Sequence, residues 1–147
     1  SGGALLNREG ELIGVNVAIA STGGQGSGSI GLGFAIPANF AYRIATEIIS
    51  GAGASHGLLG AMVTDAQSVA TSTVTGAYID SVTPGGAADA VGLRAGDIVT
   101  KFNGLPITNR IDLTAQVRTL PGGTTATMTY VRAGNSYTVE VTLGELE

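Results

Sequence analysis

Residues 85–104 read Gly-Gly-Ala-Ala-Asp-Ala-Val-Gly-Leu-Arg-Ala-Gly-Asp-Ile-Val-Thr-Lys-Phe-Asn-Gly, and this stretch decides the fold. Its alanine-rich start predicts a one-turn helix at 86–90, and the glycines that follow predict a loop. Within 97–102, Ile98, Val99 and Thr100 are β-branched and Phe102 is aromatic, which predicts a strand. Asn103-Gly104 predicts a tight turn, because both residues tolerate a positive φ. We expect Asp97 to be a turn residue whose carboxylate accepts hydrogen bonds from nearby backbone N–H groups.

The rest of the second half has the pattern of a small, mainly β domain. A helix is expected at 110–119, where Leu113, Val117 and Leu120 share one face. Residues 132–135 (Arg-Ala-Gly-Asn) predict a hairpin turn between two strands. The further strands are expected at 58–64, 75–82, 124–131 and 136–143.

The order small-small-x-x-x-Gly-Leu-x-x-Gly-Asp-Ile-Φ-x-x-Φ-Asn-Gly, which residues 87–104 follow, resembles the middle of a PDZ domain of the bacterial protease type. The resemblance implies a PDZ-like, partly open β-barrel or sandwich over residues 58–147. PDZ domains bind peptide ends by adding a strand to the edge of a sheet. The overall class expected is mainly β with two or three helices (α+β).

Residues 56–63 (His-Gly-Leu-Leu-Gly-Ala-Met-Val) resemble the carboxylate loop and the following strand of such a domain. A glycine in this loop lets the backbone approach a ligand, and converging N–H groups can hold a carboxylate. The helix 110–119 would form the other wall, and a small or medium apolar C-terminal residue would fit between them. Taken alone, the same residues also read as a buried strand. The predicted peptide-binding residues are Leu58, Leu59, Gly60, Ala61, Met62, Val63, Leu113 and Val117.

The first fifty residues have a different composition. Residues 12–17 and 34–36 predict strands, and the Gly- and Ser-rich segment 20–33 predicts a flexible loop. Pro37 suits the first turn of a helix that we expect from Ala38 to Ser50. The small, polar residues 51–57 predict a linker.

The start of the chain, Ser1 to Asn16, resembles the segment that begins at the nucleophile of chymotrypsin-fold proteases, and residues 30–37 resemble the strand that ends this fold in the HtrA/DegP family. We therefore expect the C-terminal part of an HtrA/DegP-type, trypsin-like serine protease. Residues 1–50 would be a piece of the protease β-barrel, 51–57 the linker and 58–147 the PDZ domain.

The resemblance implies that Ser1 is the nucleophile of an active parent. A serine nucleophile needs a histidine base, an aspartate that orients it and an oxyanion hole. The family's histidine and aspartate precede the serine, and the single histidine here, His56, lies in the predicted linker. We expect His56 to be exposed, with a place near the peptide carboxylate as the alternative. The chain alone is therefore expected to be inactive, and the initial Ser1 in place of methionine suggests a fragment.

Composition excludes several other functions. The net charge of −4 does not suit nucleic-acid binding, because a protein needs a basic surface to displace counterions. With no cysteine and one histidine, thiolate chemistry and a conventional zinc site are excluded. The acidic residues form no calcium loop, and no phosphate-binding glycine loop is present. No cofactor and no metal are expected.

The expected function is therefore peptide binding by a PDZ module of an exported serine endopeptidase for protein quality control in bacteria. The alternatives are a stand-alone PDZ adaptor and a catalytically inactive protease relative. The partners expected are unfolded segments with apolar C-termini and the remaining part of the protease.

Residues 1–36 carry apolar strands with open edges, so they need a covering surface. This surface would be their own PDZ domain, the rest of the protease or, as our preferred prediction, another copy in a homo-oligomer formed by segment exchange. The implied location is extracytoplasmic, in the cell envelope, the periplasm or the medium, and membrane anchoring through an upstream segment stays open.

Overall fold

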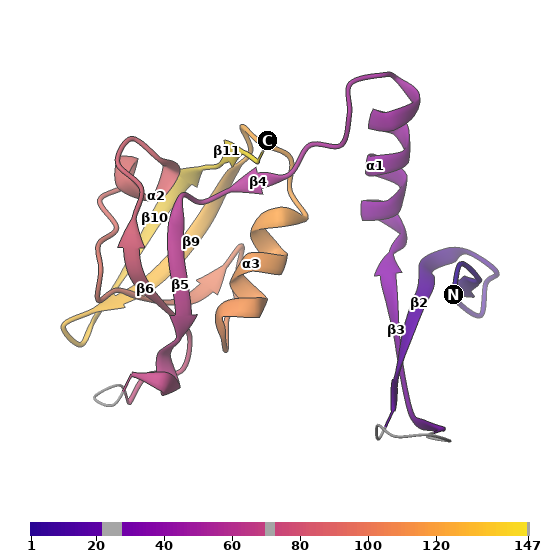
Figure 1. The fold of residues 1–147 in the computed structure, drawn as a ribbon, viewed down its shortest axis with the longest axis horizontal. Helices are drawn as coiled ribbons and strands as arrows, with labels where there is room; N and C mark the ends of the chain where they lie inside the picture. The colour runs from indigo at the N-terminus through magenta and orange to yellow at the C-terminus, as the bar shows by residue number, and fades with distance from the viewer. Residues whose placement is uncertain (22–27, 70–72, 147) are drawn as a thin grey trace. The chain divides into compact units, whose positions relative to one another are not determined.

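The computed structural model describes residues 1–21, 28–69 and 73–146. The chain divides into two compact units, Ser1–Ala54 and Ser55–Glu147. The second unit thus begins inside the predicted linker 51–57, and Ser55, His56 and Gly57 belong to it. Figure 1 shows the elements of each unit, and the two units are described separately below.

The first unit is a three-stranded antiparallel sheet followed by a helix. The strands β1 (Ala4–Leu6), β2 (Leu12–Ser21) and β3 (Ser29–Pro37) lie in this order, and α1 (Ala38–Ile49) follows.

Both longer strands extend into the predicted loop 20–33, because Ser21 of β2 pairs with Ser29 of β3 and this pairing overrides the low strand propensity of glycine and serine. Residues 22–27 of that loop lie outside the described residues. Pro37 ends β3 in an extended conformation, with a ψ of 136°, and precedes α1 instead of lying in its first turn.

The first unit has no apolar core of its own within its described residues. Only Gly14 is buried there. On α1, Ile48 is 60% exposed, and Arg43 and Glu47 form a partly buried ion pair of 2.6 Å. The large apolar side chains of this unit that are at least 40% exposed are Leu5, Leu6, Leu12, Ile13, Val17, Ile19, Ile30, Leu32, Phe34, Tyr42, Ile48 and Ile49.

The second unit is mainly β with two α-helices, as the sequence predicts. Its strands are β4 (Gly57–Leu58), β5 (Ala61–Asp65), β6 (Ala77–Val82), β7 (Ile98–Phe102), β8 (Leu105–Pro106), β9 (Thr125–Arg132), β10 (Asn135–Thr142) and β11 (Gly144–Glu145). Its helices are a 3₁₀ turn η1 (Ala66–Ser68), α2 (Ala87–Ala90) and α3 (Arg110–Arg118).

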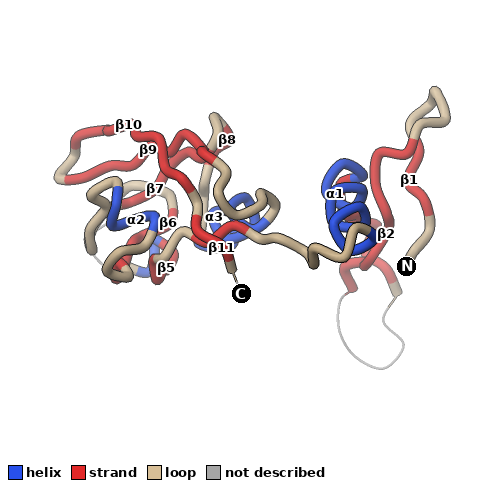
Figure 2. The backbone as a smooth tube through the Cα atoms, turned by 90° about the horizontal axis from the view of Figure 1, so that it is seen from above, coloured by secondary structure: helices blue, strands red, loops and turns tan. Residues whose placement is uncertain are grey.

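The main sheet has the order β10-β9-β7-β6-β5, with β8 paired to β7, and it stays open instead of closing into a barrel. Figure 2 shows β9 and β10 as a long hairpin. The short strands β4 and β11 form a separate antiparallel pair. The predicted strand 58–64 is interrupted at Leu59 and Gly60, because Gly60 has a φ of +72° and turns the chain between β4 and β5. The sequence does not predict β8, β11 or η1.

The core of the second unit lies between the sheet and its two α-helices. Ile79, Val99, Phe102 and Met128 are fully enclosed, and Leu113 of α3 is 1% exposed. Each such side chain contributes about 1.5–3 kcal/mol by its removal from water.

Asp97 is the one buried charged residue among the described residues. As predicted, its carboxylate accepts a hydrogen bond from a nearby backbone group, the N–H of Arg94, at 2.7 Å. It also accepts from the guanidinium of Arg132 at 2.6 and 2.7 Å, a contact the sequence does not reveal. Arg132 donates in addition to the carbonyl of Gly92. The ion pair therefore fastens the loop before β7 to the end of β9, and Asp97 raises the pKa of Arg132.

Candidate peptide-binding groove

The strand β5 forms one edge of the main sheet. It pairs with β6 on one side, and no strand in the described part of the chain pairs with its other side. The helix α3 packs against β5 and β6, as Figure 1 shows for its position beside β5. An open strand edge beside a helix is the geometry that accepts an added strand.

A pocket of about 110 Å³ lies between the start of β5 and α3. Leu113 and Val117, which are 1% and 4% exposed, contribute its helical wall. The lining residues are Gly57, Leu58, Leu59, Gly60, Ala61, Val63, Leu113, Thr114, Val117 and Arg118. Its walls are mainly apolar, so it suits an apolar side chain.

Seven of the eight predicted peptide-binding residues line this pocket, and Met62 does not. Successive side chains of a strand point to opposite faces, so Ala61 and Val63 border the pocket while Met62 is 70% exposed. Thr114 and Arg118 also line the pocket and are not among the residues predicted from the sequence. Thr114 and Arg118 are four residues apart, so they lie together on α3 beside the row formed by Leu113 and Val117.

The loop between β4 and β5 presents unpaired backbone donors. The carbonyl of Leu59 accepts from the N–H of Ala88 and the carbonyl of Gly60 accepts from the N–H of Thr83, both at 2.8 Å. The N–H groups of Leu59 and Gly60 themselves donate to no acceptor within the described residues. A loop that is held by its carbonyls and keeps its N–H groups unpaired can receive an anion such as a carboxylate.

Gly60 is required by this loop for two reasons. Its φ of +72° lies in the left-handed region, and a Cβ atom there would lie 3.3 Å from the Cα of Gly86. Any side chain at Gly60 would therefore strain the loop and press on the residue before α2. A substitution of Gly60 would change stability as well as binding.

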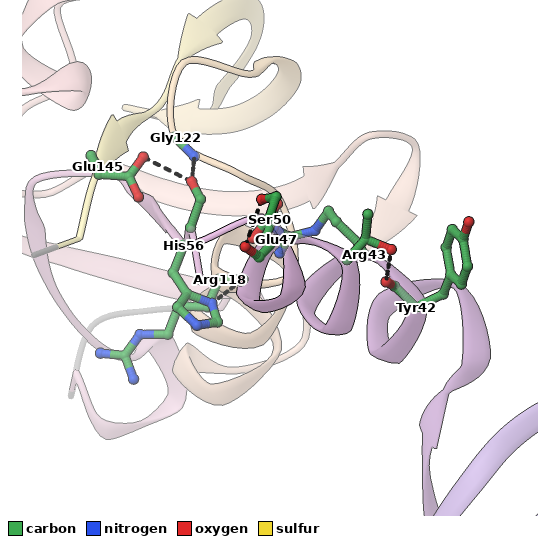
Figure 3. Close-up of polar contacts among 10 residues, drawn as sticks. Tyr42, Arg43, Glu47, Ser50, His56, Arg118, Gly122 and Glu145 are labelled. Carbon is green, nitrogen blue, oxygen red and sulfur yellow. Dashed lines mark hydrogen bonds and ion pairs between the residues drawn. The ribbon is translucent and has the colours of Figure 1, made fainter. Parts of the chain in front are cut away.

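The C-terminal end of α3 is fastened to the segment that enters the second unit. The N–H of Gly57 donates to the carbonyl of Leu120 at 2.7 Å. The Nδ1 atom of His56 lies 3.0 Å from the carbonyl oxygen of Arg118, as Figure 3 shows. A carbonyl only accepts, so Nδ1 of His56 carries the proton in this contact. His56 is thus partly buried and structural, and not the exposed linker residue that the sequence predicts.

A second set of contacts holds the C-terminal strand in place. The hydroxyl of Ser55 donates to Glu145 at 2.8 Å and accepts from the N–H of Gly122 at 3.0 Å. Glu145 and Gly122 are labelled in Figure 3. The N–H of Leu146 donates to the carbonyl of His56 at 2.8 Å. The segment at the start of β4 is therefore held both by the end of α3 and by the residues around β11.

Ser1 is exposed in the first unit and borders a separate hollow of about 380 Å³. The N–H of Gly2 donates to the carbonyl of Asn16 at 2.7 Å, which holds the start of the chain beside β2. Val17 and Gly33 line the same hollow. The structure thus brings Ser1 close to parts of β2 and β3 but supplies no histidine or aspartate within this hollow's lining.

No group of three or more histidine, cysteine, aspartate or glutamate residues that could hold a metal ion occurs within residues 1–21, 28–69 and 73–146. No helix in the same ranges is both long enough and apolar enough to cross a membrane.

The family model described as "PDZ domain" matches residues 57–143, which include the pocket and the main sheet. The periplasmic pH-dependent serine endoprotease DegQ of Escherichia coli K12 is 40% identical over 148 residues, which cover 97% of this chain and 32% of DegQ. The serine protease PepD of Mycobacterium tuberculosis is 46% identical over 152 residues, covering 100% of this chain and 32% of PepD. The chain spans about a third of the length of these relatives.

Solved structures give the same result. The HtrA-type protease AlgW with a decapeptide is 29% identical, with a TM-score of 0.63, and the match covers 100% of this chain and 46% of AlgW. The serine endoprotease from Yersinia pestis is 31% identical, with a TM-score of 0.59, and the match covers 100% of this chain and 48% of that protein. The mainly β fold and the resemblance to HtrA proteases predicted from the sequence are confirmed.

Proposed function

The chain belongs to the PDZ domain family, and from this premise we propose that its second unit binds apolar C-terminal or extended segments of other proteins by adding them as a strand to β5. The open edge of β5 beside the pocket carries the proposal. The unpaired N–H groups of Leu59 and Gly60 support it, because they are available for the carboxylate of a peptide.

The size of the pocket limits the terminal side chain. A volume of about 110 Å³ suits a valine, alanine or leucine better than a large aromatic ring. Leu113 and Val117 are already enclosed in the core, so the pocket wall is fixed by packing. The proposed ligand therefore ends in a small or medium apolar residue with a free carboxylate.

The test places a large side chain on α3 so that it fills the groove. Thr114 lines the pocket and is partly buried, whereas Ala115 is the next residue and is exposed. Thr114→Trp should reduce binding of a fluorescent valine-ended peptide at least about tenfold in fluorescence polarisation, because the indole occupies the ligand's place. Ala115→Trp is the matched control and should bind as the unmodified chain does. Equal binding by both variants would overturn the groove assignment.

We also propose that this PDZ domain serves an exported serine endoprotease of protein quality control, in which Ser1 is the nucleophile. The support is the identity of 40% to DegQ and 46% to PepD across both units. The relatives' names place DegQ and DegP in the periplasm, which supports an extracytoplasmic location. We expect the chain alone to be inactive, because its one histidine, His56, is bonded to the carbonyl of Arg118.

Activity-based labelling tests the role of Ser1. A fluorophosphonate probe should label the serine in a protein that includes the upstream residues, and should leave residues 1–147 unlabelled. Ser1→Ala in the longer protein is the control and should abolish labelling. A folded longer protein that resists the probe would instead support the inactive relative, and upstream sequence unrelated to a protease would support the stand-alone adaptor.

A further inference from the structure

The end of the pocket that would receive a peptide carboxylate lies beside the last turn of α3. Gly57 and Leu58 border the pocket together with Val117 and Arg118, and the N–H of Gly57 bonds to the carbonyl just after the helix. The C-terminus of a helix carries a partial negative charge, which repels an anion. A carboxylate bound to the N–H groups of Leu59 and Gly60 would therefore be repelled by the end of α3, unless a cation offsets the charge of the helix end.

Arg118 is the basic residue in the last turn of α3 and lines the pocket. Its side chain is exposed and forms no hydrogen bond or ion pair within the described residues, while its backbone carbonyl is held by His56 at 3.0 Å (Figure 3). The backbone is thus fixed, and the guanidinium remains available to a ligand. Glu145, on the strand paired with β4, has its carboxylate engaged by the hydroxyl of Ser55.

We propose that the guanidinium of Arg118 pairs with the terminal carboxylate of the bound peptide and makes the groove select free C-termini over amidated or internal segments. This inference rests on the proposed function and assigns one further residue to its specificity. The N–H groups of Leu59 and Gly60 hold the carboxylate oxygens, and Arg118 compensates the charge of the helix end. Arg118 acts on the ligand's charge and not on its apolar side chain.

The expected contribution of Arg118 to binding is small because its side chain is exposed to solvent. An ion pair open to solvent is screened, so the loss of Arg118 should weaken binding of a free acid by about threefold. Screening also makes the contribution depend on salt, and the acid's advantage over the amide should shrink as ionic strength rises.

The experiment uses residues 1–147 and two fluorescent peptides of one sequence ending in valine, one with a free carboxylate and one with a C-terminal amide. Arg118→Gln removes the charge. Arg110→Gln, at the first residue of the same helix, is the matched control. We expect the unmodified chain and Arg110→Gln to prefer the acid equally. Arg118→Gln should lose about threefold for the acid and nothing for the amide.

The outcomes separate the two proposals. If Arg118→Gln binds the acid as tightly as the unmodified chain, or loses the same factor for both peptides, the role of Arg118 is overturned while peptide binding stands. If the unmodified chain binds neither peptide, the proposed function is overturned, and the role of Arg118 falls with it. Thermal unfolding of the variants checks that all three chains are equally folded.

Discussion

The two units of this chain contain similar elements and differ in what those elements enclose. The second unit buries a continuous cluster that runs from Leu59 to Leu143. The first unit has three strands and a helix, yet Gly14 is the single buried residue in its described part. A sheet needs a second layer to bury its apolar face. Strand pairing alone gives the first unit no buried apolar cluster, so we predict that its stability depends on another surface.

The largest difference between the two units should appear in thermal unfolding when the chain is divided between Ala54 and Ser55. We expect residues 55–147 to unfold cooperatively with heat, because their core is complete. Residues 1–54 alone should show no cooperative transition, because their apolar side chains stay in water. Circular dichroism measures both. A cooperative and concentration-independent transition of residues 1–54 would contradict the view that they need another surface. Light scattering would detect the homo-oligomer predicted from segment exchange.

Truncating one isoleucine in each unit compares how much a buried and an exposed side chain contribute to stability. Ile79 is fully buried in β6, and Ile79→Ala should lower the free energy of unfolding by about 2–5 kcal/mol through the cavity it leaves. Ile19 is 63% exposed in β2, and Ile19→Ala should change it by less than about 0.5 kcal/mol. Urea denaturation of the full chain gives both values. A large loss from Ile19→Ala would mean that the first unit is covered in solution.

One ion pair in each unit allows the same comparison between a buried and an exposed charge. Arg132 is partly exposed but its partner Asp97 is buried, so Arg132→Met should lower the free energy of unfolding by leaving a buried carboxylate without its counter-ion. Arg8 and Glu9 form an exposed pair of the same length in the first unit, and Arg8→Met should cost less than about 0.5 kcal/mol. The same denaturation experiment compares them. Equal costs would contradict the burial argument.

The smallest expected effect is the change in stability at acidic pH that is due to Asp112. The hydroxyl and the N–H of Thr108 donate to Asp112 and lower the pKa of that carboxyl below its ordinary value of 3.8. Stabilisation from Asp112 is therefore complete above pH 3.8 and is lost as the pH falls through the lower, folded pKa. Asp112→Asn should lose less stability on acidification in this range. The difference between Asp112→Asn and the unmodified sequence should be the same in residues 55–147 as in the full chain, since Asp112 lies in the second unit.

The sequence predicts the second unit well because its local signals agree with its packing. The run 85–104 forms α2, the loop and β7 as predicted, and the helix expected at 110–119 is Arg110–Arg118. Leu113 and Val117 occupy the pocket wall that their spacing indicates. The predicted site differs mainly at Met62, because membership of a strand does not specify which face borders the groove.

What the sequence does not predict depends on contacts between distant residues. The pairs of Arg132 with Asp97 and of Ser55 with Glu145 join positions that no local pattern connects. His56 reads as a linker residue because its neighbours are small and polar, yet it bonds to the carbonyl of Arg118. The strand β3 begins earlier than its composition suggests because β2 supplies the hydrogen bonds.

The brevity of β5 has a kinetic consequence. Its five residues offer a guest few main-chain hydrogen bonds, so each encounter should end quickly and affinity for any single tail should be modest. If the proposed function holds, durable capture would come from avidity, in which several such modules bind one protein at several places and the protein that leaves one module is retained by the others.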